Sequence, residues 1–209
     1  MMRCRGTSAL WSASAKWAGA MLALWISCGG SLHAQNRVFN GDFDVDVAGW
    51  EPRSGGTLVW TDLSEATGCP NSGMGLSTSV DVGGMDVASV SQCVGSLTPG
   101  QSFAVRASHL GYGSFSIEVD FLGTIDCESG LLTGVGTPFV PQDPAIWGTE
   151  ILQTTVPANA FSARVRLVAT DFDPHGLGVD GVVVSARPAL LLDGFEADDA
   201  GSPTPCRWN

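Results

Sequence analysis

The chain has 209 residues, with 21 acidic and 10 basic side chains and a formal net charge of −11. Nucleic acids and anionic membranes are bound through cationic surfaces, so this charge excludes both as expected partners. The length is sufficient for one domain with a hydrophobic core, and the many carboxylates are compatible with calcium binding.

The first 34 residues have the pattern of a secretory signal peptide. An apolar run from Trp17 to Ile26 follows three basic residues, Arg3, Arg5 and Lys16. This run is shorter than the roughly 20 apolar residues that a membrane span needs, so no membrane span is expected. Cleavage is expected after Ala34, and a lipoprotein signal with Cys28 as the lipidated residue is the alternative. We therefore expect a secreted protein, in the periplasm or outside the cell.

The rest of the chain has the sequence pattern of β-strands, without a long stretch of helical periodicity. Residues 87–93 are strand-like, and apolar and polar residues alternate over residues 102–108, 114–121 and 161–170. Alternation with a period of two places one set of side chains in a core and the other on an exposed face. Turns rich in Gly and Pro separate these runs. Many short strands at this spacing predict an all-β sandwich of two antiparallel sheets.

Two segments lie outside these strands. Residues 123–148 are rich in Gly and Pro, and we expect them to form a long, mobile loop over one sheet. Residues 189–209 contain the sequence Asp193-Gly194-Phe195-Glu196 and resemble the short endings of many secreted bacterial proteins. We therefore expect a single domain over residues 35–188, followed by a C-terminal tail.

The two ends of the predicted domain carry its most informative motifs. Asn40-Gly41-Asp42-Phe43-Asp44, followed by Gly49-Trp50, opens the domain, and Gly178-Val179-Asp180-Gly181-Val182-Val183-Val184 closes it. Together they resemble the first and last strands of carbohydrate-binding-module jelly rolls, the family 4/9-like, galactose-binding-like sandwiches. The resemblance covers residues 37–187 in the order of features. It implies a jelly roll in which the closing strand lies beside the opening segment, and it points to a binding module without naming the ligand.

The resemblance also implies a structural calcium ion. In that family, the acidic residue of the opening motif and the Asp of the closing strand help to bind the ion, and these positions are Asp44 and Asp180 here. Calcium prefers about six to eight oxygen ligands, so backbone carbonyls would complete the shell. Asp44 replaces the usual Glu and reaches less far. The alternative is that both side chains are solvated charges at strand ends.

Four cysteines follow the predicted signal peptide: Cys69, Cys93, Cys127 and Cys206. An even number in a secreted chain predicts two disulfides, with three possible connectivities. Cys93–Cys127 is favoured because each of the two residues ends a strand-like segment, and those two strands are able to lie near one another. Cys69–Cys206 would then tie the tail to the domain. The cysteine spacings match no zinc-binding pattern.

Exposed aromatic side chains are candidate sugar-binding residues, because a flat ring stacks on the apolar face of a sugar. Trp147, in the long loop, and Tyr112, between two glycines in a turn, are best placed for exposure. Trp60 is expected either in the core or in a cleft, and Trp50 in the core. The alternative for the exposed aromatics is that each covers a hydrophobic edge.

Charged side chains on the exposed faces of the predicted strands complete this candidate site. Arg106, Glu118 and Arg164 would line one face if their strands are neighbours in one sheet. The alternative is cross-strand pairing of arginine and glutamate, including Arg166, that serves solubility alone. His109 has no second histidine at ligand spacing and is expected at the surface.

No recognisable catalytic motif is present. The chain lacks a Gly-x-Ser-x-Gly sequence and a pair of carboxylates in a known catalytic context. We therefore expect a secreted, non-catalytic module that binds a carbohydrate polymer or another glycan through aromatic stacking and polar contacts on one sheet face. The alternative is a structural or adhesive extracellular surface protein that uses the same sandwich without a sugar site.

Overall fold

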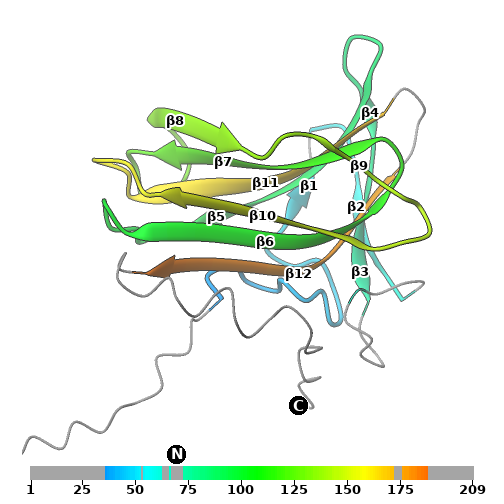
Figure 1. Cartoon of the computed structure of the whole chain (residues 1–209), viewed down its shortest axis with the longest axis horizontal. Helices are drawn as coiled ribbons and strands as arrows, with labels where there is room; N and C mark the ends of the chain where they lie inside the picture. Colours follow the sequence, from blue (N-terminus) through cyan, green and yellow to red (C-terminus); the bar gives the residue numbers. More distant parts are fainter. Residues whose placement is uncertain (1–35, 53, 63–65, 67–72, 172–175, 188–209) are drawn as a thin grey trace, which may run out of the picture. The chain divides into compact units, whose positions relative to one another are not determined.

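The computed structural model describes residues 36–52, 54–62, 66, 73–171 and 176–187. Within these residues the chain is all β, with twelve strands in two antiparallel sheets that form a sandwich (Figure 1). This confirms the predicted jelly-roll fold class. No helix in the described part is long and apolar enough to cross a membrane. The predicted signal peptide, the tail at 189–209, Cys69 and Cys206 all lie outside the described residues.

The larger sheet contains β1 (Glu51–Pro52), β4 (Val80–Asp81), β5 (Asp86–Val94), β7 (Ser114–Leu122), β8 (Leu131–Gly136), β9 (Val140–Pro141) and β11 (Ser162–Asp171). Its main path runs β1–β5–β11–β7–β8, while β4 pairs with β5 and β9 pairs with β7. β11 therefore separates β5 from β7, although β5 and β7 come much earlier in the chain.

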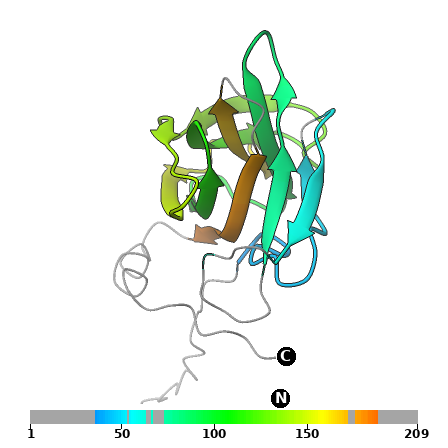
Figure 2. The same ribbon diagram turned by 90° about the vertical axis from the view of Figure 1, so that its right-hand side faces the viewer.

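The smaller sheet contains β2 (Leu58–Thr61), β3 (Met74–Thr78), β6 (Ser102–Gly111), β10 (Gly148–Thr155) and β12 (Gly176–Arg187). The strand order is β10–β6–β12–β3–β2, so the closing strand β12 lies between β6 and β3 (Figure 2).

The predicted alternation fills the space between the two sheets. Apolar side chains from β5, β6, β7, β11 and β12 that are at most 2% exposed form its centre: Ala88, Val90, Val94, Phe103, Val105, Ala107, Phe115, Ile117, Val119, Phe121, Ala163, Val165, Leu167, Leu177, Val179, Val182 and Val184. Phe103 of one sheet meets Phe121 of the other edge to face, with ring centroids 5.4 Å apart. Burial of this apolar surface is the main force that holds the sheets together.

His109 belongs to the core side of β6, and the prediction that it lies at the surface is wrong. It has the same parity along the strand as Phe103, Val105 and Ala107, and it is only 4% exposed. Its ring stacks on Phe115 with centroids 4.1 Å apart. A polar residue at the end of an alternating strand therefore follows the alternation into the core.

The segment 123–148 is also more ordered than predicted. It contains β8 and β9, both paired with β7. The predicted strand at 161–170 is confirmed as β11, but Phe161 lies just before it and is 44% exposed. Glycine at positions 134 and 136 weakened the strand signal of β8, since glycine is depleted in strands.

The opening segment lies beside the second half of β12, as the resemblance implies. The backbone N–H of Arg37 donates to the Val184 carbonyl at 2.8 Å, and the N–H of Val182 donates to the Gly41 carbonyl at 2.8 Å. The Asn36 amide donates to the Val182 carbonyl and accepts from the Val184 N–H. Residues 36–41 thus occupy the side of β12 that β3 occupies along the first half of the strand.

A β-bulge in the closing motif makes this change of partner possible. The register between β12 and β6 shifts between Asp180 and Val183, and Gly181 has a φ of 57°. Gly41 then approaches β12 so closely that a Cβ at this position would lie 2.1 Å from the Val182 oxygen. The glycines of the two motifs are therefore required by the contact between them.

Candidate functional site

The charged residues of the sequence-predicted site lie on two different sheets. Glu118 of β7 and Arg164 of β11 are on the outer face of the larger sheet, where the two strands pair directly. Arg106 lies on β6 in the smaller sheet, opposite Ile151 of β10. The condition for the three residues to line one face, that their strands are neighbours in one sheet, is therefore not met for Arg106. Alternation determines the face of a strand and not the sheet to which the strand belongs.

Cross-strand pairing accounts for much of the outer face of β7 and β11. Arg166 contacts Glu118 at 3.1 Å and Asp120 at 3.0 Å. These pairs connect adjacent strands and are partly exposed, so each contributes little stability, about 0–1 kcal/mol. Cross-strand pairing of arginine and glutamate is therefore present at Arg166 and Glu118.

The predicted aromatic residues occupy several environments. Trp50 is buried and in the core cluster, as predicted. Trp60 packs against the same cluster and its Nε1 donates to the Phe43 carbonyl at 2.7 Å. Tyr112 is 50% exposed and lines a small pocket with Asp86, Ala169 and other residues. Trp147 is half-buried and directly precedes β10.

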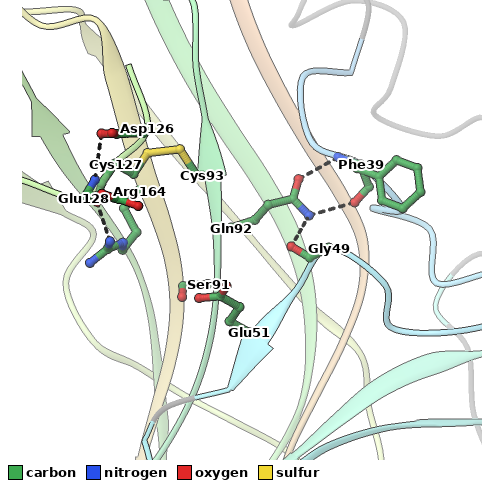
Figure 3. Close-up of a pocket in the computed structure, with 10 residues that line it drawn as sticks. All are labelled: Phe39, Gly49, Glu51, Ser91, Gln92, Cys93, Asp126, Cys127, Glu128 and Arg164. Atoms are coloured by element: carbon green, nitrogen blue, oxygen red, sulfur yellow. Dashed lines mark hydrogen bonds between the residues drawn. A yellow bond between two sulfur atoms is a disulfide. The ribbon is translucent and has the colours of Figure 1, made fainter. Parts of the chain in front are cut away.

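A different part of the molecule combines a pocket with an exposed aromatic ring. A pocket of about 500 Å³ opens on the outer side of the larger sheet, where β1, β5 and β11 meet the loop between β7 and β8 (residues 123–130). We call it the Phe39 pocket. Figure 3 shows its lining: Phe39, Gly49, Glu51, Ser91, Gln92, Cys93, Asp126, Cys127, Glu128 and Arg164. Of the sequence-predicted binding residues, Arg164 lies in it.

Gln92 holds the exposed aromatic residue at the rim of this pocket. Its side-chain oxygen accepts from the Phe39 N–H at 2.6 Å, and its nitrogen donates to the carbonyls of Phe39 at 2.9 Å and Gly49 at 3.0 Å. Phe39 is 66% exposed, the highest value of any aromatic side chain in the described part of the chain. A buried amide therefore fixes the backbone that presents an apolar ring to solvent.

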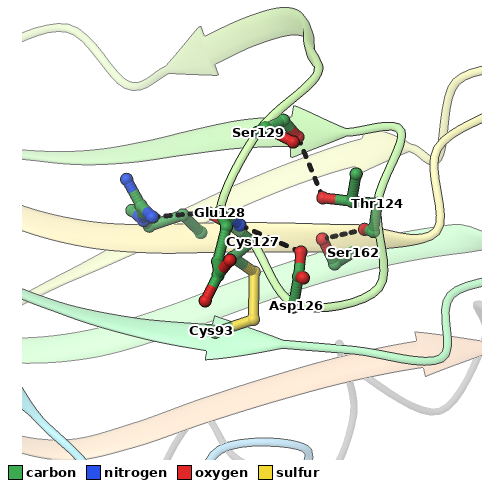
Figure 4. The surroundings of a disulfide bond; sticks show 8 residues. Cys93, Thr124, Asp126, Cys127, Glu128, Ser129 and Ser162 are labelled. Atoms are coloured by element: carbon green, nitrogen blue, oxygen red, sulfur yellow. Dashed lines mark hydrogen bonds between the residues drawn. A yellow bond between two sulfur atoms is a disulfide. The ribbon is translucent and has the colours of Figure 1, made fainter.

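A disulfide anchors the opposite wall of the pocket. Cys93 at the end of β5 is bonded to Cys127 in the β7–β8 loop, with their Cα atoms 5.8 Å apart, which confirms the predicted pairing (Figure 4). Cys93 belongs to β5 and the loop of Cys127 follows β7, and these two strands are not neighbours, since β11 lies between them. Arg164 of β11 donates from Nη2 to the Cys127 carbonyl below this bridge.

Hydrogen bonds inside the β7–β8 loop orient its carboxylates. The Glu128 N–H donates to Asp126 Oδ1 at 3.1 Å, and the Gly123 N–H donates to the Gly130 carbonyl. The bond from the Glu128 backbone, with a further bond from Thr124, lowers the pKa of Asp126 below its usual value. Asp126 is therefore a carboxylate at neutral pH and is suited to accept hydrogen bonds from a ligand.

The sequence contains one signal for this site that was not recognised. Ala88, Val90 and Val94 of β5 face the core, and Gln92 occupies the same side of the strand. A polar residue at a core-facing position indicates a buried partner, and here the partner is the backbone of the opening segment. The exposure of Phe39 itself had no signal, because an isolated aromatic residue beside a strand usually packs in the core.

The two predicted calcium ligands have different environments. Asp44 is exposed, whereas Asp180 is fully buried and accepts from the N–H groups of Ala66 at 2.8 Å and Gly181 at 2.7 Å. Among the described residues, no group of three or more His, Cys, Asp or Glu side chains is arranged to hold a metal ion. Calcium binding at Asp44 and Asp180 remains a prediction.

The fold has counterparts among known structures, although no family model and no curated protein matches the chain. The family 16 carbohydrate-binding module-2 aligns with a TM-score of 0.53 and 16% identity over 71% of this chain and 99% of that chain. A family 61 module, solved in complex with β-1,4-galactotriose, aligns with a TM-score of 0.51 and 11% identity over 74% of this chain and 100% of that chain.

A larger protein contains a similar domain. The enzymatically active domain of tailspike protein 4 from bacteriophage CBA120 aligns with a TM-score of 0.56 and 15% identity, covering 72% of this chain but only 21% of that chain. The chain thus spans nearly all of the two modules and about a fifth of the tailspike domain. At these identities the likeness shows a shared fold, the jelly-roll sandwich of carbohydrate-binding modules.

Proposed function

We propose that the protein binds a carbohydrate in the Phe39 pocket. The observation that carries the proposal is one exposed aromatic ring, three carboxylates and a guanidinium around a single pocket. Its fold is shared with modules such as the family 61 module, whose structure contains a bound galactotriose. Protein sites for sugars combine a few polar groups with an apolar surface, and these are the components present here.

Each group would have a definite part in binding. The Phe39 ring would stack on the apolar C–H face of a sugar, and its fixed backbone reduces the entropy lost on binding. Glu51, Asp126 and Glu128 would accept hydrogen bonds from hydroxyl groups, and Arg164 would donate them. Because Asp126 has a lowered pKa, it stays ionised and would serve as an acceptor for hydroxyl groups.

Binding to a glycan array, followed by titration of the strongest ligand, tests the proposal. We expect Phe39→Ala to weaken the affinity by about tenfold, which corresponds to the loss of one aromatic contact. Glu51→Gln should weaken it several-fold, because an amide is a poorer acceptor than a carboxylate. The measurement is a calorimetric titration of each variant.

Tyr112→Ala and Trp147→Ala serve as matched controls, because they remove the two aromatic residues that the sequence favours. Both variants should bind within about twofold of the wild type. If these two variants lose binding while Phe39→Ala keeps it, the site lies at the sequence-predicted aromatics instead. Repeating the titration with a chelator tests whether calcium at Asp44 and Asp180 supports the fold or the binding.

The second candidate function is a structural or adhesive scaffold without a sugar site. The observation that favours it is the ion-pair network of Arg166 with Glu118 and Asp120, which covers a sheet face with polar groups. The scaffold function predicts that no glycan on the array binds to the wild-type protein and that Phe39→Ala changes nothing.

A further inference from the structure

β8 forms one edge of the larger sheet. It pairs with β7 on one side, and no other strand of the described part of the chain pairs with its second side. Five of its six residues are exposed and the sixth is half-buried. An edge strand of this kind presents a row of backbone donors and acceptors that another strand is able to pair with.

The hydrogen-bond pattern identifies which backbone groups point outward. The Thr137 N–H donates to the Ile117 carbonyl at 2.9 Å, and Val119 and Phe121 lie opposite Val135 and Thr133 in the same register. Hydrogen-bonded and non-bonded pairs alternate along an antiparallel ladder. The pairs with bonds to β7 are therefore those at 133 and 135, and Gly134 and Gly136 direct their N–H and C=O groups to the open edge.

The edge is uncharged in an otherwise acidic chain. No charged residue occurs from Ser129 to Gln142, although the chain carries 21 acidic residues and a net charge of −11. The carboxylates opposite Gly134 and Gly136 on β7 are Asp120 and Glu118, and Arg166 contacts both. Two copies of an acidic protein repel one another over most of their surfaces, so an uncharged strip is where they approach at the lowest electrostatic cost.

Apolar side chains border the same edge. Leu131 and Leu132 of β8 are 64% and 46% exposed, and Ile125 in the adjoining loop is 74% exposed. Natural sheets usually protect an open edge with charged residues, especially lysine, and β8 has none. Exposed apolar residues next to an unprotected strand indicate an interaction surface.

We propose that β8 pairs with β8 of a second copy of this chain, antiparallel and about a twofold axis. This geometry matches the strip to itself, so the neutral edge of one copy meets the neutral edge of the other, and Leu132 of each copy lies beside β8 of its partner. The outward groups of Gly134 and Gly136 form hydrogen bonds with the partner strand, and the larger sheets of the two copies become continuous. This proposal is independent of carbohydrate binding.

Sedimentation velocity over a range of protein concentrations tests the proposal. The wild-type protein should form dimers, and Leu132→Glu should weaken dimerisation by at least about tenfold because it places a negative charge in the neutral strip where two acidic copies meet. Gly134→Pro should have the same effect, since it removes an outward N–H and leaves the bonds to β7 in place. Circular dichroism and thermal melting verify that both variants are folded.

Ile151→Glu is the matched control, because Ile151 is 47% exposed on β10, which is one of the two edge strands of the smaller sheet. The dimerisation constant of this variant should lie within about twofold of that of the wild type. The proposal is overturned if the wild type is monomeric up to roughly 100 µM, a concentration at which even a weak specific dimer is populated. It is also overturned if Ile151→Glu and Leu132→Glu weaken the dimer equally.

Discussion

Gly41 is the residue at which the opening segment comes closest to the closing strand. Its carbonyl accepts from the Val182 N–H, and its Cα faces the Val182 carbonyl. Asn40 before it has a φ of 52° and Phe43 after it has a φ of 44°. The Asn-Gly-x-Phe motif is thus a tight turn that places the fully buried Phe43 against Gly75.

Gly41→Ala should lower the free energy of unfolding by about 2–3 kcal/mol, because the new Cβ collides with a backbone oxygen that cannot move without separating the segment from β12. Urea denaturation measures the change. Gly123→Ala is the control, since the nearest atom to its Cβ would be 3.6 Å away. Equal stability of the two variants would contradict the assigned contact.

His109 gives the fold a dependence on pH. Its burial against Phe115 lowers the pKa from 6.5 to about 4. Since the pKa of His109 is lower in the folded than in the unfolded state, the contribution of the neutral His109 ring to stability is complete above pH 6.5. That contribution is lost as the pH falls toward 4, up to about 3 kcal/mol.

His109→Phe should remove this dependence while keeping a ring against Phe115. The measurement is the free energy of unfolding at several pH values between 7 and about 4. The pKa of Asp126 is also lowered, so the contribution of Asp126 to stability is lost only as the pH falls below the usual pKa of an aspartate. The effect of Asp126 therefore lies at the acid end of this window. If the free energy of unfolding changes with pH equally in the variant and in the wild type, His109 is not the titrating group.

The β7–β8 loop is the element whose position most directly shapes the Phe39 pocket. The Cys93–Cys127 bond joins it to β5, and Ser162 of β11 donates to the Thr124 carbonyl at 2.6 Å. The disulfide closes a chain segment with a sequence separation of 34. A loop of that length restricts the unfolded chain by about 3–4 kcal/mol.

Replacing Cys93 and Cys127 together by serine should therefore reduce the free energy of unfolding by about 3–4 kcal/mol. Ligand affinity at the Phe39 pocket should fall as well, because Asp126 and Glu128 lose their anchored position. Denaturation and calorimetric titration measure the two effects separately. Full affinity in a folded double variant would show that the loop does not contribute to binding.

Strand identity and side-chain facing were largely predictable, because alternation is a local property of residues such as Phe103, Val105 and Ala107. The sheet to which each strand belongs was not predictable, as Arg106 demonstrates. Its strand and that of Glu118 are consecutive in the chain, yet they belong to opposite layers. The pairing partner of a strand depends on contacts that are distant in sequence, such as Asp180 with Ser108.

The candidate site was less predictable than the fold. Arg164 was expected to contribute, but Phe39, Glu51 and Glu128 were not singled out. They converge from the opening segment, β1 and the β7–β8 loop, which have little regular structure of their own. Such segments are positioned by a few side-chain contacts, here those of Gln92 and the disulfide, and no periodic pattern in the sequence marks them.

At the scale of the whole molecule, the two proposed surfaces both involve the larger sheet, and they adjoin at the β7–β8 loop. One wall of the Phe39 pocket comes from β1 and β5, at one end of the strand order of the larger sheet, whereas Asp126, Cys127 and Glu128 belong to the loop that leads into β8 at the other end. A dimer formed through β8 would carry one Phe39 pocket on each copy. Two pockets on one particle would bind a repeating polymer more tightly than a single pocket, wherever the polymer reaches both.

The location of a bound oligosaccharide is the most direct test of carbohydrate binding in the Phe39 pocket. A crystal structure with the strongest glycan from the array would provide it. We expect one sugar ring stacked on Phe39, with hydroxyl groups hydrogen-bonded to Glu51, Glu128 or Arg164. A sugar bound beside Trp147 or Tyr112, with the Phe39 pocket empty, would contradict the assignment of the site.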